Sequence, residues 1–174
     1  MALTVETGTG VTGADSYISL ADANTYVSNH GDSAAWSAAT DASKEQALRL
    51  ATQYIDLKYA DRFKGCKTWN TQAKRQNLQW PRQGAIDNDG YEYPDDEMPA
   101  CLLSAVVEAA LRIIAGDDLL GVIETGTIAS ESSTVGPLSQ SISYVGGKMP
   151  MKQYPKIYAL IRPIINSSTQ MMRG

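Results

Sequence analysis

The sequence predicts a mainly α-helical protein, in which a helical bundle carries a protruding β-hairpin and a C-terminal helical arm. Over most of the chain, apolar residues recur at spacings of three and four, as in amphipathic helices. Between residues 126 and 145 the spacing changes to two, which is typical of strands. A last helical pattern follows a proline at position 155. We therefore expect the bundle in residues 1–121, the hairpin in 122–147 and the arm in 148–174, the size of one domain with an appendage.

Capping residues mark the first predicted helix. The stretch from Leu3 to Glu6 can form a short strand, and a glycine-rich turn follows it. Ser19 with Asp22 three residues later has the pattern of a capping box. Gly31 ends this helix, because glycine readily adopts the left-handed conformation found after a helix C-terminus.

The longest predicted helix comes after a loop that carries Trp36. Thr40, Asp41 or Ser43 can cap this helix, and the spacing of its apolar residues continues to about Tyr59. The sequence leaves the choice among the three caps open.

Two prolines, Pro81 and Pro99, mark the expected helix boundaries in the middle of the chain. Helix-forming residues over 71–79 predict a helix that stops before Trp80, because Pro81 pushes the preceding residue toward an extended conformation. The loop that follows is rich in Gly, Asp and Asn and ends at Pro99, which fits the first turn of a new helix. That helix has a wide apolar stripe and ends at Gly116, so we expect it at the centre of the core.

The hairpin and the last helix are expected to stand apart from this core. One arm of the hairpin begins near Thr127, and alternating residues from Leu138 to Tyr144 form the other. Both faces are polar, so we expect the hairpin to project. Pro155 opens the last helix, and Pro163 should kink it because proline cannot donate to the carbonyl four residues earlier.

The composition excludes several classes of protein. With 43% hydrophobic and 20% charged residues, the chain is globular rather than disordered. Charges or prolines interrupt every apolar stretch before the ~18 residues that a membrane span needs, so no membrane partner is expected. Residues 1–13 lack the basic start and apolar run of a secretory signal. Cys66 and Cys101 form no paired motif, and we expect reduced thiols, as in a cytoplasm.

Charge is segregated along the chain into blocks of alternating sign. Residues 1–43 carry five acids and no Lys or Arg, and residues 44–82 carry nine bases and three acids. Residues 83–131 carry eleven acids and one base, whereas residues 132–174 carry five bases and no acid. The blocks can meet within one monomer, or a positive face of one copy can meet a negative face of the next.

No motif predicts catalysis, a metal or a cofactor. Residues 8–13 satisfy G-x-G-x-x-G, and Asp32 follows at about the spacing of a ribose-binding acid. The next helix begins too late, and no second parallel strand is visible, so a flexible turn is favoured over a nucleotide-binding enzyme. His30, the single histidine, is expected to donate to the end of its helix. The acids at 95–97 lack the ligand spacing of a calcium loop.

From Lys58 to Arg82, tryptophans are interleaved with cations. This composition suits single-stranded nucleic acid, because bases stack on aromatic rings while cations contact phosphates. The contacts expected on that hypothesis are Trp69, Trp80, Lys67, Lys74 and Arg75. The alternative is that the tryptophans belong to the core and the basic face is solvated. The acidic pI of about 4.9 favours this alternative.

A series of short segments occurs in a fixed order along the chain: Ala14 to Tyr26, Trp36, Lys44 to Asp56, Gln76 to Arg82, Met98-Pro99 and Ser133 to Leu138. The series resembles a family of head-to-tail connector, or head-completion adaptor, proteins of tailed bacteriophages, some of which carry a DnaT-like single-stranded-DNA-binding label. The resemblance covers nearly the whole chain and is strongest at the Leu78 to Arg82 element and the Gly-Pro pair of the hairpin. It implies a twelve-fold ring beneath the portal.

The leading hypothesis from the sequence is therefore a structural virion protein that connects capsid to tail. The implied partners are other copies of the chain, the portal protein, a tail or neck protein, and the genomic double-stranded DNA that passes through the ring. Expected interface residues are Trp80, Pro81, Arg82, Val135, Gly136, Pro137, Leu138, Ile142 and Tyr144. We expect acids of residues 83–131 to line the lumen and the basic tail of residues 148–173 to dock on the portal.

This hypothesis places the protein at the virion neck after synthesis in the host bacterial cytoplasm. It involves no enzymatic activity and no cofactor. Single-stranded-DNA binding remains the alternative.

Overall fold

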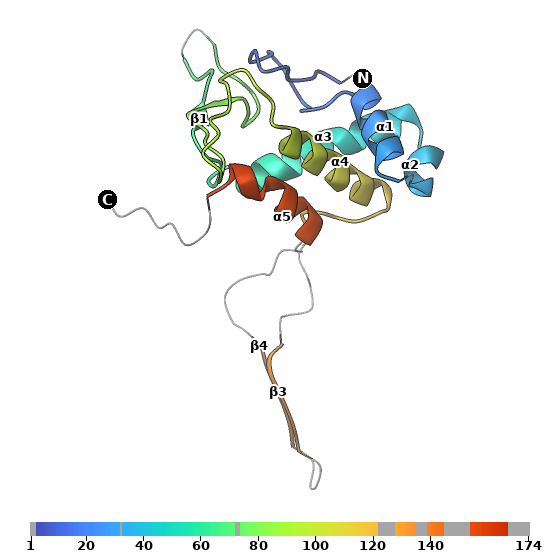
Figure 1. Ribbon diagram of the computed structural model, residues 1–174. Helices are drawn as coiled ribbons and strands as arrows, with labels where there is room; N and C mark the ends of the chain where they lie inside the picture. Colours follow the sequence, from blue (N-terminus) through green and yellow to red (C-terminus); the bar gives the residue numbers. More distant parts are fainter. Residues whose placement is uncertain are drawn as a thin grey trace, which may run out of the picture. The chain divides into compact units, whose positions relative to one another are not determined.

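The computed structural model describes residues 3–31, 33–71, 74–121, 128–134, 139–144 and 154–166. Contacts group the chain into two units (Figure 1). One unit combines Met1–Asp117 with Tyr154–Gly174, and we call it the helical body; the other is Asp118–Gln153. The mainly α-helical fold class is confirmed.

The helical body contains five α-helices and a short two-stranded ribbon within its described residues. The helices are α1 (Leu20–Asn29), α2 (Ala34–Ala38), α3 (Asp41–Tyr59), α4 (Ala100–Ile114) and α5 (Pro155–Ile161). A 3-10 turn over Arg162–Ile164 continues directly from α5. The ribbon pairs β1 (Cys66–Lys67) with β2 (Arg82–Gln83) in antiparallel register.

Capping side chains and a glycine lie at the helix ends where the sequence predicted them. The Ser19 hydroxyl accepts the Asp22 N–H at 3.1 Å, and Thr40 is the cap of α3, accepting the Ser43 N–H at 3.2 Å. After α4, Gly116 adopts a φ of 92°, and paired backbone bonds close a Schellman motif. His30 contacts the end of α1 as expected, with Nδ1 2.9 Å from the Tyr26 carbonyl oxygen.

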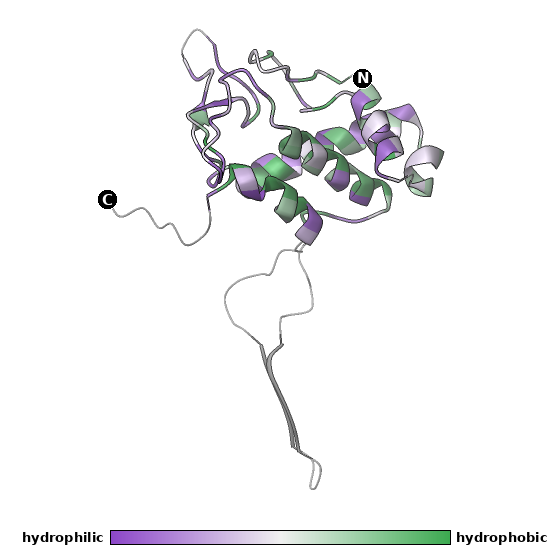
Figure 2. Ribbon diagram, in the orientation of Figure 1, coloured by the Kyte–Doolittle hydropathy of each residue, from purple (hydrophilic) through white to green (hydrophobic). Residues whose placement is uncertain are grey.

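The core lies where α4 packs against both α3 and α5. Hydrophobic residues of these three helices gather where the helices lie side by side (Figure 2). Fully buried side chains come from each of them, among them Leu48, Ile55, Leu102, Val106, Ile157 and Ile161. Burial of such aliphatic side chains, at roughly 1.5–3 kcal/mol each, is the main stabilising contribution to this packing.

The predicted helix over 71–79 is wrong: Thr71 and residues 74–79 contain no helical turn. A tight reversal takes its place, in which Asn70 bridges to Arg75 and the Thr71 N–H bonds to the Lys74 carbonyl. The buried Gln76 side chain accepts the Trp69 N–H and donates to the Leu78 and Pro81 carbonyls. One side-chain amide thus satisfies three backbone groups that lie in or beside this reversal.

Smaller differences concern the ends of the chain and one missed helix. The expected strand near Leu3 is a single bridge between Val5 and Ser16, and Trp36 lies in the short α2 rather than in a loop. Pro163 does not kink α5, because the α-helix ends at Ile161 and continues as the 3-10 turn. The last helix, α5, packs on α4 and groups with the helical body.

The second unit contains the expected β-hairpin. Strand β3 (Ile128–Thr134) pairs antiparallel with β4 (Ser139–Tyr144), from Ile128 opposite Tyr144 to Thr134 opposite Ser139. The register shifts between Ile128 and Ser130, as at a β-bulge. Four expected interface residues, Val135, Gly136, Pro137 and Leu138, lie outside the described residues. Ile142 and Tyr144 are placed on β4.

Candidate functional site

The Leu78 to Arg82 element is part of the core. Trp80 has no exposed surface, and its ring meets Phe63 and Tyr93 edge to face at centroid distances of 6.1 and 5.9 Å. Pro81 is buried and follows a cis peptide bond. This burial leaves no face of Trp80 for a DNA base or for a neighbouring subunit.

Arg82 fixes the same element to the ribbon. Its guanidinium donates to the Lys64, Gly65 and Gln79 carbonyls at 2.8, 2.7 and 3.2 Å, and only 8% of the residue is exposed. Gly65 has a φ of 70°, and a Cβ there would come within 2.4 Å of the Gln83 carbonyl oxygen. The element therefore locks the loop onto the body, and its arginine is committed to backbone groups.

A half-buried carboxyl joins α3 to this loop. Tyr17 Oη donates to Asp56 Oδ1 at 2.5 Å, and the Gln79 N–H lies 3.0 Å from Asp56 Oδ2. The Trp80 N–H donates to Tyr17 Oη at 3.2 Å. Burial raises the pKa of Asp56 to about 6, although its hydrogen bonds oppose that rise. These groups position the loop, and Asp56 and Gln79 also line a pocket of about 440 Å³ together with Asp15 and Arg49.

The G-x-G-x-x-G segment has its amide groups occupied. The buried Glu6 side chain accepts the Gly8 and Gly10 N–H groups on Oε1 at 3.0 and 2.9 Å. Its Oε2 accepts the Val11 N–H at 2.9 Å. A nucleotide-binding loop needs such N–H groups for the phosphates. Here a carboxylate of the same chain holds them, so the segment is a fastened turn rather than the flexible one that we expected.

Trp69 lies against this turn with one face occupied. Its Nε1 donates to the Gly8 carbonyl at 3.3 Å, and a Cβ at Gly10 would come within 2.5 Å of the Trp69 ring. Lys74 Nζ lies 4.1 Å from the ring centroid and bonds to the Thr9 carbonyl. The structure thus brings Trp69 and Lys74 together, as the single-stranded-DNA hypothesis expected, but in a contact that holds the turn.

Lys67 lines a pocket of about 460 Å³ beside the ribbon. Its other lining residues are Ala60, Cys66, Thr68, Asn70, Thr71, Gln79, Arg82 and Gln83. Burial lowers the pKa of Lys67, and the neighbouring charges of Arg82 and Arg75 lower it further, while Asp56 opposes them. The charges of Lys67, Arg75 and Arg82 therefore lie close enough to influence one another. We call this hollow the Lys67 pocket.

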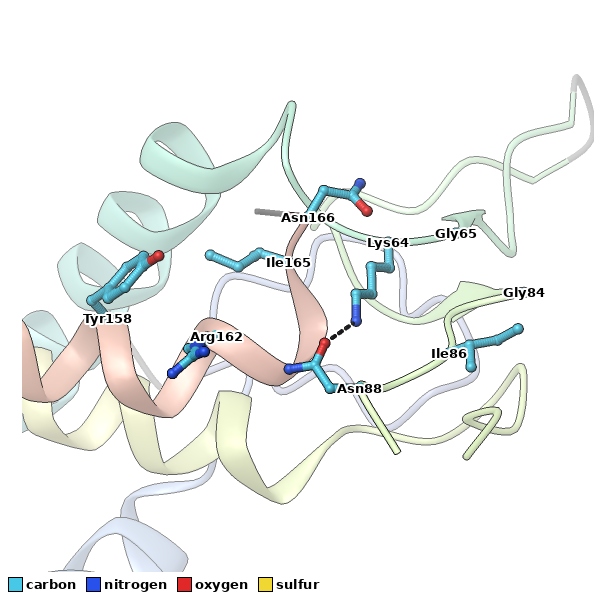
Figure 3. Close-up of a pocket in the computed structure, with 9 residues that line it drawn as sticks. All are labelled: Lys64, Gly65, Gly84, Ile86, Asn88, Tyr158, Arg162, Ile165 and Asn166. Atoms are coloured by element: carbon cyan, nitrogen blue, oxygen red, sulfur yellow. Dashed lines mark hydrogen bonds between the residues drawn. The ribbon is translucent and has the colours of Figure 1, made fainter. Parts of the chain in front are cut away.

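Lys64 lines a larger pocket of about 670 Å³, shown in Figure 3, which we call the Lys64 pocket. Its remaining lining residues are Gly65, Gly84, Ile86, Asn88, Tyr158, Arg162, Ile165 and Asn166. Two backbone bonds across distant parts of the chain build one wall: the Lys64 N–H donates to Ile164 at 3.0 Å, and the Asn166 N–H donates to Arg62 at 2.7 Å. The loop after β2 supplies the opposite wall.

Neither pocket has an acidic residue among its lining residues, although the chain has more acids than bases. Within the described residues, the cations around the ribbon make no ion pair; they are Arg62, Lys64, Lys67, Lys74, Arg75, Arg82 and Arg162. In contrast, Lys44, Arg49, Arg112 and Lys156 each lie within 4.0 Å of a carboxylate. Cations without a direct carboxylate partner therefore gather around the ribbon.

Sequence reasoning missed Lys64 and Arg162 as site residues. Lys64 lies inside the basic stretch that was singled out, but the sequence hypothesis chose the cations Lys67, Lys74 and Arg75 to accompany the tryptophans. Arg162 is far away in sequence, and only the backbone pairing described above brings it to the same pocket. For Arg162, the available sequence signal was that residues 132–174 carry bases and no acid.

Two other kinds of site find no support in the described part of the chain. Its His, Cys, Asp and Glu side chains form no group of three or more that could hold a metal ion. None of its helices is long and apolar enough to cross a membrane.

Comparison with protein families gives a match, over residues 1–174, to the family described as "Putative DnaT-like ssDNA binding protein". The chain belongs to this family. No curated protein and no solved structure matches the chain. The family description agrees with the single-stranded-DNA hypothesis of the sequence, whereas the bacteriophage connector assignment stays a prediction.

Proposed function

We propose that this member of the DnaT-like family binds single-stranded DNA, without catalysis, on the surface around the β1–β2 ribbon. The observation that carries the proposal is the group of cations around the two pockets, none of which forms an ion pair with a described carboxylate. Phosphates bind to such groups by displacing counterions, which is the main source of affinity for nucleic acids.

The arrangement favours single strands over duplex. Single strands expose base edges and faces, and both pockets carry neutral groups that can bond to them, such as Asn88, Asn166 and Asn70. The net charge of −4 opposes general binding to DNA, so contacts must come from this local region. The buried Trp80 takes no part, which changes the set of contacts expected from the sequence.

The test is fluorescence anisotropy of a labelled 20-nucleotide oligonucleotide titrated with purified protein near physiological ionic strength. The double variant Lys64→Gln/Lys67→Gln removes one cation from each pocket, and Lys44→Gln removes an ion-paired cation elsewhere as its control. We expect saturable binding that the double variant weakens at least tenfold and the control leaves unchanged. No binding by the intact protein, or equal binding by all three proteins, contradicts the proposal.

A second candidate function is the bacteriophage head-to-tail adaptor, and the hairpin is the observation that favours it. Strands β3 and β4 form a sheet of two strands, so among the described residues each strand has one edge without a partner strand. An isolated two-stranded hairpin is marginally stable in water, and open edges pair readily with other chains. Charge blocks of opposite sign also suit head-to-tail packing of copies.

On this second proposal the chain forms a ring, expected to be twelve-fold, between portal and tail at the virion neck, and genomic DNA passes through its lumen. Residues 135–144 would then contact a neighbour or the tail. Mixing the protein with portal protein and measuring the mass of the complex tests it. A discrete multiple of 18.8 kDa added to the portal supports the adaptor, and a chain that stays monomeric at saturating portal excludes it.

A further inference from the structure

We propose that the Lys64 pocket is a subsite for one nucleotide of the single strand, in which Tyr158 stacks on the base while Lys64 and Arg162 contact the phosphates. The inference rests on the proposed function and assigns an aromatic platform beside these cations, which the buried Trp80 does not provide. The volume of about 670 Å³ lies within the range of roughly 300–1,000 Å³ typical of small-molecule sites.

Tyr158 has the exposure and the support that a stacking platform needs. The residue is 39% exposed on α5, and it lies one helical turn before Arg162. The Arg62 guanidinium lies 5.8 Å from the Tyr158 ring centroid and also donates to the Asn166 carbonyl at 3.2 Å. Arg62 therefore ties the ring to the opposite rim of the pocket and restricts its motion before a ligand arrives.

The cations have donors left for phosphate. Lys64 Nζ donates to Asn88 Oδ1 at 2.8 Å and to the Pro163 carbonyl at 2.9 Å (Figure 3). An ammonium has three N–H donors, so one remains. Arg162 is exposed and forms no ion pair with a described carboxylate. Both groups line the same hollow, in which no carboxylate repels an anion.

Neutral groups around the cations fit a base better than an acidic peptide. Asn88 and Asn166 are exposed side-chain amides; Asn88 offers its N–H donors, since its Oδ1 accepts Lys64 Nζ, and Asn166 offers donors and an acceptor to a base edge. The ring of Tyr158 and the exposed side chain of Ile86 offer apolar surface to a flat group. A phosphate, a planar ring and hydrogen-bonding edges occur together in a nucleotide, whereas an acidic peptide would use the charges alone.

The experiment combines affinity with a direct contact readout. Tyr158→Leu removes the ring and keeps apolar volume, Tyr158→Phe keeps the ring, and Tyr91→Leu is a control at an exposed tyrosine outside the pocket. We expect Tyr158→Leu to weaken oligonucleotide binding roughly tenfold, in line with the loss of one stacked base. Tyr158→Phe and Tyr91→Leu should bind like the intact protein. Photocrosslinking to an oligonucleotide that contains 5-iododeoxyuridine should label Tyr158.

The outcomes separate this inference from the function on which it rests. If the intact protein binds no oligonucleotide, the proposed function and the subsite both fail. If the intact protein binds but Tyr158→Leu and Arg162→Gln bind equally well and crosslinks map elsewhere, the subsite alone is overturned. Equal competition for the pocket by a poly-glutamate peptide would also overturn it, since charge alone would then explain binding.

Discussion

The Glu6 carboxylate fastens the N-terminal turn by accepting three backbone N–H groups at 2.9–3.0 Å. Glu6→Gln keeps the shape but replaces one acceptor oxygen by a donor that faces an N–H. We expect the free energy of unfolding to fall by about 1–3 kcal/mol, the cost of leaving a buried donor without a partner. Denaturant unfolding measures the change, with the exposed Glu92→Gln as control. Equal stability of the two variants would show that the carboxylate does not hold the turn.

The raised pKa of Asp56 makes stability depend on pH with a defined sign. Because the pKa rises from 3.8 to about 6 on folding, the folded state holds a proton between these values that the unfolded state releases. This group's contribution therefore falls as pH rises from 4 to 6 and stays low above pH 6. Over this pH range, the contribution of Asp56 to the free energy of unfolding changes by roughly 3 kcal/mol.

Asp56→Asn removes that titration. We expect the intact protein to lose stability between pH 4.5 and pH 7 relative to the variant, as followed by urea midpoints at each pH. Because both proteins contain all the other carboxyl groups, the difference between their stabilities at each pH reports on Asp56. Parallel pH profiles for the two proteins would be incompatible with the raised pKa.

At the scale of elements, the packing of α5 on α4 makes the last helix a structural part of the body. Ile161 has no exposed surface, so Ile161→Ala leaves a cavity that should cost about 2–5 kcal/mol. Leu57→Ala, at a side chain that is 62% exposed on α3, serves as the matched control and should cost little. Thermal or urea unfolding measures both. A small effect at Ile161 would instead support the separate arm expected from the sequence.

The elements also show what the sequence could predict. Helices α3 and α4 were predictable because each has a long apolar stripe; Thr40 marks where α3 begins, and Gly116 follows the end of α4. The segment over 71–79 was not, because the buried amide of Gln76 bonds to the backbone of Trp69, Leu78 and Pro81, and no periodicity reveals such contacts. The Lys64 pocket was equally hidden, since it depends on contacts between residues about a hundred positions apart.

At the scale of the whole molecule, the segregated charge sets two opposing effects on DNA binding. The net charge of −4 repels phosphates at long range, whereas the unpaired cations around the ribbon attract them at contact. Salt screens the long-range repulsion beyond ~10 Å at 0.1 M, so contacts should dominate at physiological ionic strength. Affinity should then fall as salt rises.

The slope of that fall counts the phosphate contacts. Each contact on a single strand contributes roughly −0.7 to the slope of log affinity against log salt concentration. Lys67→Gln should make the slope shallower by about that amount, because Lys67 lines a pocket without acids. Lys44→Gln should leave the slope unchanged, because Lys44 lies 3.7 Å from Asp41, away from both pockets. Anisotropy titrations from 50 to 300 mM salt measure both slopes. A shallower slope for Lys44→Gln alone would place the DNA on another face of the molecule.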